Sequence, residues 1–457
     1  MTTSRTLLAL GAGLAALAAA ASASADDIVI HAGRLIDGVS KAPRNQVSIL
    51  IHDDRITAVQ DGFVDPAGAR VIDLSNATVL PGLIDCHVHI TSQSDGGDTV
   101  HEAVTRTIED KAYLSTRYVR NTLEAGFTSV RDVGGDTDLV IALKRAIAAG
   151  TIPGPRMWVA GAPLGPTGGH NDPADGLDPD LSHPHWTDVT IDSPEAARHA
   201  VRDYHRRGAD LIKIMPSGGV LSIGDDPSLQ LMADDEIKAV VDTAHALHMK
   251  VAAHIHGTEA INHAVALGID SVEHGSFADD ESYRLMKEHG TYLVPTMLIG
   301  ERVLETAREH PERLPPTAAA KAIAVVPTMQ ANFAKAVKAG VKIAFGTDES
   351  LVPHGENAKE FALMVKFGGM TPMAAIQAAT SSAADLIGDT PDIGSVQPGR
   401  YADIIAVAGN PLDDVTRLEH VEFVMKSGVV YKQGGKPTMA LLGSPDKSDP
   451  GGQFDGL

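Results

Sequence analysis

The sequence has very little cysteine and fewer basic than acidic residues. One residue in 457 is cysteine, which excludes an intramolecular disulfide framework and a zinc site built from thiolates alone. The 38 basic residues stand against 59 acidic ones, a formal net charge of −21. Because phosphates repel such a chain, it is a poor partner for DNA, RNA or anionic membranes. Histidine, by contrast, occurs 20 times, which favours a metal site of imidazoles and carboxylates.

Long apolar runs are absent after the first 25 residues. The one candidate, residues 7–21, follows Arg5 and precedes a small-x-small sequence at 23–25. This order is typical of a secretory signal peptide over residues 1–25. A membrane anchor is the alternative, but the run is short for a span of about 20 residues. We therefore expect an exported protein, periplasmic or secreted, with no stable membrane insertion after cleavage.

Both ends of the expected mature chain have the pattern of short β-strands. The period of two and the β-branched residues predict a small β-sandwich domain built from both termini, at 26–78 and 390–436. Residues 437–457 are rich in glycine, proline, serine and aspartate, which predicts a flexible tail. The segments with this strand pattern are 28–30, 47–51, 56–59, 71–74, 402–407, 421–425 and 428–431.

Residues 79–389 alternate between short apolar runs and helical patterns. Eight such units predict an α/β domain, a (β/α)8 TIM barrel. An open, doubly wound sheet would give a similar pattern. The barrel is favoured because polar residues follow many of the runs, and a barrel gathers all its strand ends around one mouth. The expected strands are 79–85, 128–132, 157–160, 211–214, 251–253, 271–273, 292–295 and 341–345.

Two of the expected strands are followed by pairs of histidines with one residue between the members. His87 and His89 follow the first strand, and His254 and His256 follow the fifth. Residues two apart on an extended chain point to the same side, so each pair can approach one ligand. A single pair of this kind is a common coincidence.

A lysine lies inside the fourth expected strand. Lys213 sits among apolar residues, where a cation is costly unless it is neutralised or paired. One interpretation is a buried ion pair with Asp210 or Glu273. The other is carbamylation by CO2, which would turn the amine into a carboxylate able to bridge two cations.

Two further polar residues complete the pattern. His274 follows the sixth expected strand and Asp348 follows the eighth. Either could be an ordinary buried polar group on its own. Together with the histidine pairs and the lysine, they occupy the C-terminal ends of strands one, four, five, six and eight. Because these ends meet at the mouth of a barrel, we expect them to form one site.

Longer motifs surround these residues: VLPGLIDCHVH at 79–89, TGGH at 167–170, IKIMPSGG at 212–219, AAHIHG at 252–257, EHGS at 273–276, GTD at 346–348 and PHGEN at 353–357. In these motifs the chain resembles the amidohydrolase superfamily over nearly all of its mature length. Within that superfamily it resembles the imidazolonepropionase-related prolidases and carboxypeptidases, a group that includes ochratoxin-hydrolysing amidohydrolases.

The resemblance implies two divalent metal ions, with zinc as the first choice. The ions would be bridged by a hydroxide and by Lys213 in its carboxylated form, N6-carboxylysine. The hydroxide would attack the amide carbonyl, and Asp348 would carry the proton to the leaving amine. Imidazole and carboxylate ligands suit zinc, cobalt or manganese. The more buried ion would be held by His87, His89 and Asp348, and the second by His254 and His274.

Three more histidines are candidate substrate contacts. His170, in a glycine-rich loop after the third strand, is expected to donate a hydrogen bond to the oxyanion and so act in catalysis. His256 would contact the substrate, and His354 would bind a substrate carboxylate. A structural or surface role is the alternative for each. The segment 220–233 is expected to form a lid over the site.

The resulting hypothesis is a metal-dependent hydrolase that acts on C–N bonds. Its partner would be a small amide with an amino acid on the amine side: a dipeptide, an N-acyl amino acid or an ochratoxin-like amide. One alternative is a mononuclear deaminase or a hydrolase of cyclic amides of the imidazolone type. Another is a barrel that binds a ligand or metal without catalysis. Because relatives often assemble, we expect a homo-oligomer.

Overall fold

The computed structural model describes residues 27–93, 105–178, 180, 186–315 and 317–438. The expected signal peptide (1–25) and nearly all of the expected tail (437–457) lie outside the described residues, so export stays a prediction. In the part of the chain that is described, no helix has the length and hydropathy needed to cross a membrane.

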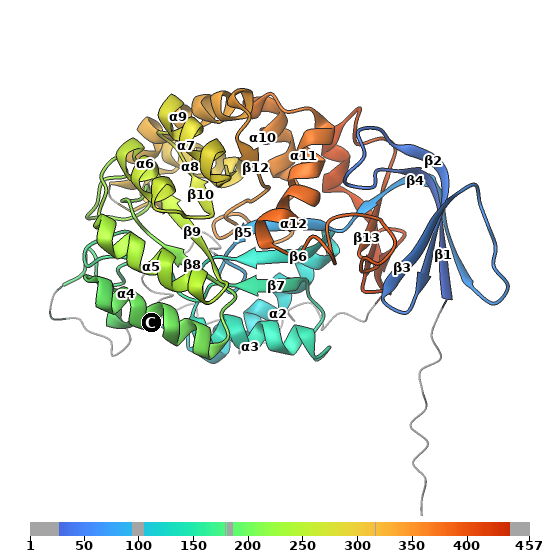
Figure 1. Cartoon of the computed structure of the whole chain (residues 1–457), viewed down its shortest axis with the longest axis horizontal. Coiled ribbons are helices and arrows are strands. Elements are labelled where there is room, and N and C mark those ends of the chain that lie inside the picture. The colour runs from blue at the N-terminus through green and yellow to red at the C-terminus, as the bar shows by residue number, and fades with distance from the viewer. Residues whose placement is uncertain (1–26, 94–104, 179, 181–185, 316, 439–457) are drawn as a thin grey trace, which may run out of the picture.

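Described residues from both ends of the chain form one eight-stranded sheet, in the order β16-β15-β14-β13-β4-β1-β2-β3. Strands β1 and β4 are parallel, and the other neighbours are antiparallel. Ile28 and Ile30 of β1 share one hydrophobic cluster with Ile404 of β13 and Phe423 of β14. Figure 1 shows these strands together at one side of the molecule. The two termini therefore pair as expected, but as one continuous sheet rather than as two separate ones.

The strands of this sheet are β1 (Asp27–Leu35), β2 (Arg44–His52), β3 (Arg55–Asp61), β4 (Arg70–Pro81), β13 (Ile404–Ala408), β14 (Val421–Lys426), β15 (Val429–Gln433) and β16 (Lys436–Pro437).

The remaining strands of the described chain are parallel and form two sheets, β5-β6-β7 and β8-β9-β10-β11-β12. Backbone contacts connect these sheets at both edges. Leu164, beyond β7, bridges Ile214 of β8. At the other edge the Cys86 N–H of β5 donates to the Phe345 carbonyl beyond β12, at 2.8 Å. Because helices separate most of these strands along the chain, the predicted α/β fold is confirmed.

The parallel strands are β5 (Leu83–Val88), β6 (Phe127–Asp132), β7 (Arg156–Val159), β8 (Leu211–Ile214), β9 (Lys250–Ile255), β10 (Ser271–His274), β11 (Tyr292–Val294) and β12 (Lys342–Ile343). The helices are α2 (Ile108–Glu124), α3 (Thr137–Ala148), α4 (Pro194–Arg207), α5 (Asp234–Ala246), α6 (Thr258–Ala266), α7 (Asp280–His289), α8 (Met297–Glu309), α9 (Ala318–Ala339), α10 (Lys359–Gly368), α11 (Pro372–Ala378) and α12 (Ser381–Ile387).

The first expected parallel strand, 79–85, is split in the structure. Leu80 belongs to β4 and pairs with β13 of the terminal sheet, while β5 begins at Leu83. Gly82 lies between the two strands, where an added Cβ would stand 2.0 Å from Thr128 Oγ1. Only glycine fits this close approach at the point where the chain passes from the terminal sheet to β5.

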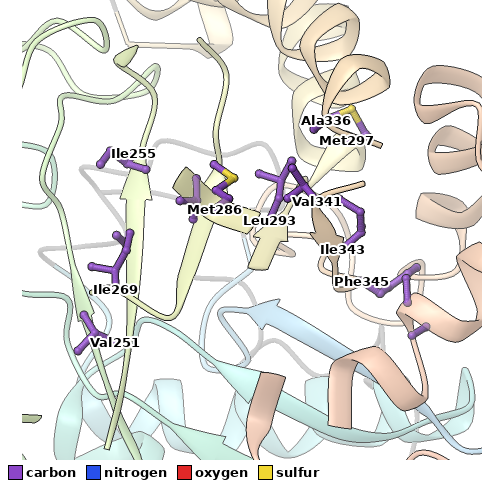
Figure 2. Packing of buried hydrophobic residues seen from close by; sticks show 14 of the residues in the cluster. Val251, Ile255, Ile269, Met286, Leu293, Met297, Ala336, Val341, Ile343 and Phe345 are labelled. Atoms are coloured by element: carbon purple, nitrogen blue, oxygen red, sulfur yellow. The ribbon is translucent and has the colours of Figure 1, made fainter. Parts of the chain in front are cut away.

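Alternate residues of the parallel strands face opposite sides, which explains where the site forms. Val251 and Ile255 of β9 and Leu293 of β11 share a hydrophobic cluster with Met297 of α8 (Figure 2). His254, between Val251 and Ile255, has the opposite direction and lines a cavity instead. Alternation along the strand therefore places apolar side chains against the helices and polar side chains in the cavity.

Candidate metal centre

Three side chains of metal-binding type meet at the ends of β5 and β12. His87 is in β5, His89 follows that strand, and Asp348 lies beyond β12. Asp348 Oδ1 is 3.0 Å from His89 Nε2 and 3.5 Å from His87 Nε2. One ligand atom from each residue lies within 4.8 Å of the others. The structure thus brings together the three residues predicted to hold one ion.

The second predicted pair, His254 and His274, lies beside this group. Their ring centroids are 4.7 Å apart, and that of His274 is 5.1 Å from that of His87. Among the described residues, the buried His254 Nε2 has no hydrogen-bond partner. Leaving a buried polar atom unsatisfied is costly, and a metal ion bound at this nitrogen would remove that cost. The donor set therefore fits the group that the sequence predicts.

Hydrogen bonds behind three of the histidines orient their rings. Each uses Nδ1 for this contact and leaves Nε2 for the centre, as metal-binding histidines do. His87 Nδ1 is 2.8 Å from Glu273 Oε2, and His89 Nδ1 is 2.8 Å from the Gly134 carbonyl. His274 Nδ1 is 2.7 Å from Thr296 Oγ1. Burial keeps the pKa of His87 and of His274 well below the ordinary value, so both rings are neutral, the form that binds metals.

Lys213 is 1% exposed in β8 and lines the same cavity. The ion pair with Asp210 or Glu273 is not formed: Asp210 pairs with Lys144, and Glu273 pairs with Arg131. No carboxylate of a described residue lies within 4.0 Å of Lys213 Nζ. Burial lowers the pKa of Lys213 to about 8, which makes the neutral amine accessible near neutral pH. That is the form that reacts with CO2.

Asp348, His274 and Thr296 have the positive φ angles of 58°, 68° and 48°. Residues other than glycine rarely adopt this conformation, and such strain concentrates at functional sites. Burial raises the pKa of Asp348, but the proximity of His87 and a hydrogen bond from His89 outweigh it and lower the pKa overall. Asp348 is therefore ionised at neutral pH and can accept a proton.

Two of the predicted substrate contacts, His170 and His256, do line the cavity. The His170 ring stacks on His254 with centroids 4.2 Å apart, and its buried Nδ1 has no partner among the described residues. Burial lowers the pKa of His170 to about 4, so it is neutral. His256 Nδ1 is 2.7 Å from Ser276 Oγ, which fixes that ring.

The third, His354, is placed elsewhere. Its Nδ1 is 3.0 Å from Glu349 Oε2, and its Nε2 is 2.8 Å from the Ser92 carbonyl. The ring packs against Tyr118 and does not line the cavity among the described residues. Both nitrogens are thus used within the protein, and the structure offers no support for His354 as a ligand of a substrate carboxylate.

Sequence reasoning missed Arg131, which is buried on β6 beneath the metal centre. Its guanidinium donates to Glu273 Oε1 at 2.7 Å, to Ser271 Oγ at 3.0 Å and to the Cys86 carbonyl at 2.6 Å. Because Glu273 also holds His87, this arginine supports a metal ligand through one intermediate. The sequence did contain a signal, since Arg131 is a charged residue inside one of the expected strands, as is Lys213.

A second support, also missed, centres on Asp85 of β5. It accepts hydrogen bonds from Thr347 Oγ1 at 2.6 Å and from Asn357 Nδ2 at 2.9 Å. Its position two residues before His87 places it on the same side of the strand. The network connects the end of β5 to the segment that carries Asp348.

Replacing Arg131 with methionine should lower the free energy of unfolding by about 3–5 kcal/mol, because Glu273 would keep a buried charge without its cation. The matched control is Arg198→Met, since Arg198 pairs with Glu195 at the surface of α4. The control should lose less than about 1 kcal/mol. Urea unfolding of the two variants measures the difference, and equal losses would contradict the supporting role of Arg131.

A cavity of about 560 Å³ opens over the metal centre. This volume is within the range of about 300–1,000 Å³ that is usual for small-molecule sites. Val220 and Leu221, at the start of the predicted lid, line it, as do apolar side chains of α8 and α9. Lys321 of α9 anchors the lid segment by donating to the Ser222 carbonyl at 2.9 Å. The centre thus lies in a cavity with an apolar wall.

Parallel strands with convergent histidines, an aspartate and a buried lysine at their carboxyl ends define an α/β enzyme with a candidate metal centre. The chain belongs to the amidohydrolase family, whose family model matches residues 78–432. It is a hydrolase that acts on amide bonds. This confirms the superfamily to which the sequence motifs pointed.

Individual relatives agree with this assignment. Ochratoxinase from Aspergillus niger is 35% identical over 429 residues, covering 89% of this chain and 87% of that protein. The crystal structure of a Xaa-Pro dipeptidase with bound methionine in the active site has a TM-score of 0.85 and 40% identity, covering 89% of this chain and all of the other. Imidazolonepropionase from Cutibacterium acnes is 26% identical over 369 residues, covering 79% of this chain and 83% of that protein.

Proposed function

We propose that the protein is a binuclear metal-dependent amidohydrolase whose eight parallel strands close into a (β/α)8 barrel. The hydrogen bonds at both edges of the two parallel sheets support closure. One observation carries the metal proposal: the two ligand groups, His87–His89–Asp348 and His254–His274, meet in one cavity that Lys213 also lines without an ion-pair partner among the described residues. Carboxylated Lys213 would bridge two divalent ions, with zinc as the first choice.

Two bound cations would polarise the scissile carbonyl and lower the pKa of a water near it. Side chains of the protein would carry out the proton transfer and the binding of the substrate. The Asp348 carboxylate accepts a proton from the attacking water and delivers it to the nitrogen of the leaving amine. His170 donates a hydrogen bond to the carbonyl oxygen as negative charge develops there. His256 contacts the substrate beside it, with its ring fixed by Ser276.

The substrate we propose is an amide whose amine side is an amino acid. Ochratoxinase and a Xaa-Pro dipeptidase are relatives that cover most of the chain, and the dipeptidase structure holds methionine, a free amino acid, in its active site. The apolar wall formed by residues such as Val303 and Met329 fits an uncharged acyl group or side chain. Dipeptides, N-acyl amino acids and ochratoxin-like amides share this chemistry.

Removing the metal should abolish hydrolysis of these amides. The purified protein would be tested on N-acyl derivatives of methionine, phenylalanine and proline, with the released amino acid measured by chromatography. Treatment with a chelator should lower the rate by at least about a hundredfold, and added zinc should restore it. Full activity after verified loss of metal would refute the proposal.

The same preparation separates the alternatives. A deaminase would release ammonia from an aminated heterocycle and contain one metal ion per chain. A hydrolase of cyclic amides would open an imidazolone ring and leave the N-acyl amino acids intact. A non-catalytic barrel would bind metal or ligand and turn over none of these compounds.

A further inference from the structure

Among the described residues, the cavity contains one positive side chain outside the metal centre. Apart from the proposed ligands and their neighbouring histidines, the ionisable residues that line it are Lys111 and Asp136. Asp136 is already used, because its Oδ1 caps helix α3 and accepts the Asp138 and Leu139 N–H groups, both at 3.1 Å. Lys111 is therefore the one described cation that the cavity offers to a substrate anion.

Lys111 is placed by helix α2, one turn from its N-terminus. A capping box between Thr107 and Asp110 fixes this end of the helix, and Tyr118 and Val119 bury its inner face. The side chain of Lys111 is half-buried, and no carboxylate of a described residue lies within 4.0 Å of its Nζ. A partly buried cation without an anion loses hydration and gains no ion pair in return. A carboxylate of the ligand would supply a charge-assisted hydrogen bond to it.

The cavity wall formed by α8 and α9 is apolar and offers a substrate carboxylate no partner. Ile299 and Val303 of α8 and Val326 and Met329 of α9 present only apolar atoms to the cavity. In Figure 1, α2 and the α8–α9 pair lie on different sides of the parallel strands. Placing a carboxylate against the apolar wall would cost desolvation without a partner, whereas the same group near Lys111 gains a charge-assisted hydrogen bond.

We propose that Lys111 binds the α-carboxylate of the amino acid on the amine side of the substrate. It would select amides with a free carboxylate over amides in which that group is blocked. This inference rests on the proposed function. It assigns to Lys111 the carboxylate-binding role that the sequence had suggested for His354. Lys111 is a substrate-binding residue in this scheme and moves no proton.

The test compares an N-acyl amino acid with its primary carboxamide, which lacks the negative charge. For the wild-type holoenzyme, kcat/KM should be higher for the acid. In Lys111→Ala, KM for the acid should rise at least about tenfold with kcat retained, while the carboxamide is unaffected. Lys111→Arg keeps the charge and should retain the preference. Lys238→Ala, which removes a surface lysine paired with Asp242, is the control and should change neither substrate.

An equal loss for acid and carboxamide, or no loss for either, would overturn the proposal. If the wild-type enzyme hydrolyses neither compound, the proposed function fails, and titration calorimetry then tests Lys111 separately. The zinc-loaded protein should bind the acid more tightly than the carboxamide, and Lys111→Ala should remove that difference. Persistence of the difference in the variant would overturn the inference.

Discussion

Replacing Asp348 with asparagine should lower turnover of the amide substrate by at least about a hundredfold while substrate binding is retained. Asparagine has the same shape and tolerates the positive φ of 58° at this position, so the backbone can keep its conformation. The hydrogen bond to His89 Nε2, 3.0 Å long in the parent protein, has an oxygen acceptor in either case. What the variant lacks is a basic carboxylate that can take a proton and return it to the leaving amine.

Metal content decides how this result is read, because Asp348 is also a proposed ligand. Single-turnover kinetics and metal analysis would be measured on the same preparation. A loss of turnover with the metal retained assigns the effect to proton transfer. Asp242→Asn, which removes an exposed charge on α5, should leave turnover unchanged. Normal turnover in Asp348→Asn with full metal content would refute the proton-shuttle role.

The strands were predictable because their signal is local. A buried strand needs a short run of β-branched and apolar residues, and the runs expected at 211–214 and 271–273 coincide with β8 and, but for one residue, with β10. Pairing partners are not local. The continuation of β4 to Pro81 depends on contacts with β13, more than 300 residues away along the chain, so the boundary near Gly82 could not be read from the run itself.

The site was predictable where a strand dictates direction. His87 and His254 lie within strands, so the period of two fixed the side to which they point. His354 lies in a loop, where no such period applies, and the structure turns both its nitrogens toward Glu349 and Ser92. Thr296 could not be found either, because its contact with His274 depends on a left-handed backbone at the start of α8.

Replacing Lys213 with methionine should lower the metal content from about two ions per chain to at most one and reduce turnover at least about a hundredfold. Methionine is unbranched and apolar, so it can occupy this buried position in β8 without a new desolvation penalty. The loss would therefore come from the missing bridge between the two ligand groups. A variant that keeps both ions, or a parent protein with one ion that the change leaves in place, would contradict the binuclear centre.

Lys426 provides a matched control for burial. It is also a buried lysine whose pKa burial lowers to about 8, but it lies in the terminal sheet and donates to the Gly154 carbonyl at 2.6 Å. Lys426→Met should keep its metal and its turnover even if its stability falls. Carboxylation itself can be followed by adding ¹³C-bicarbonate to the metal-free protein together with zinc. A carbamate carbon resonance should appear in the parent protein and in Lys426→Met but be absent from Lys213→Met, which would assign the modification to Lys213.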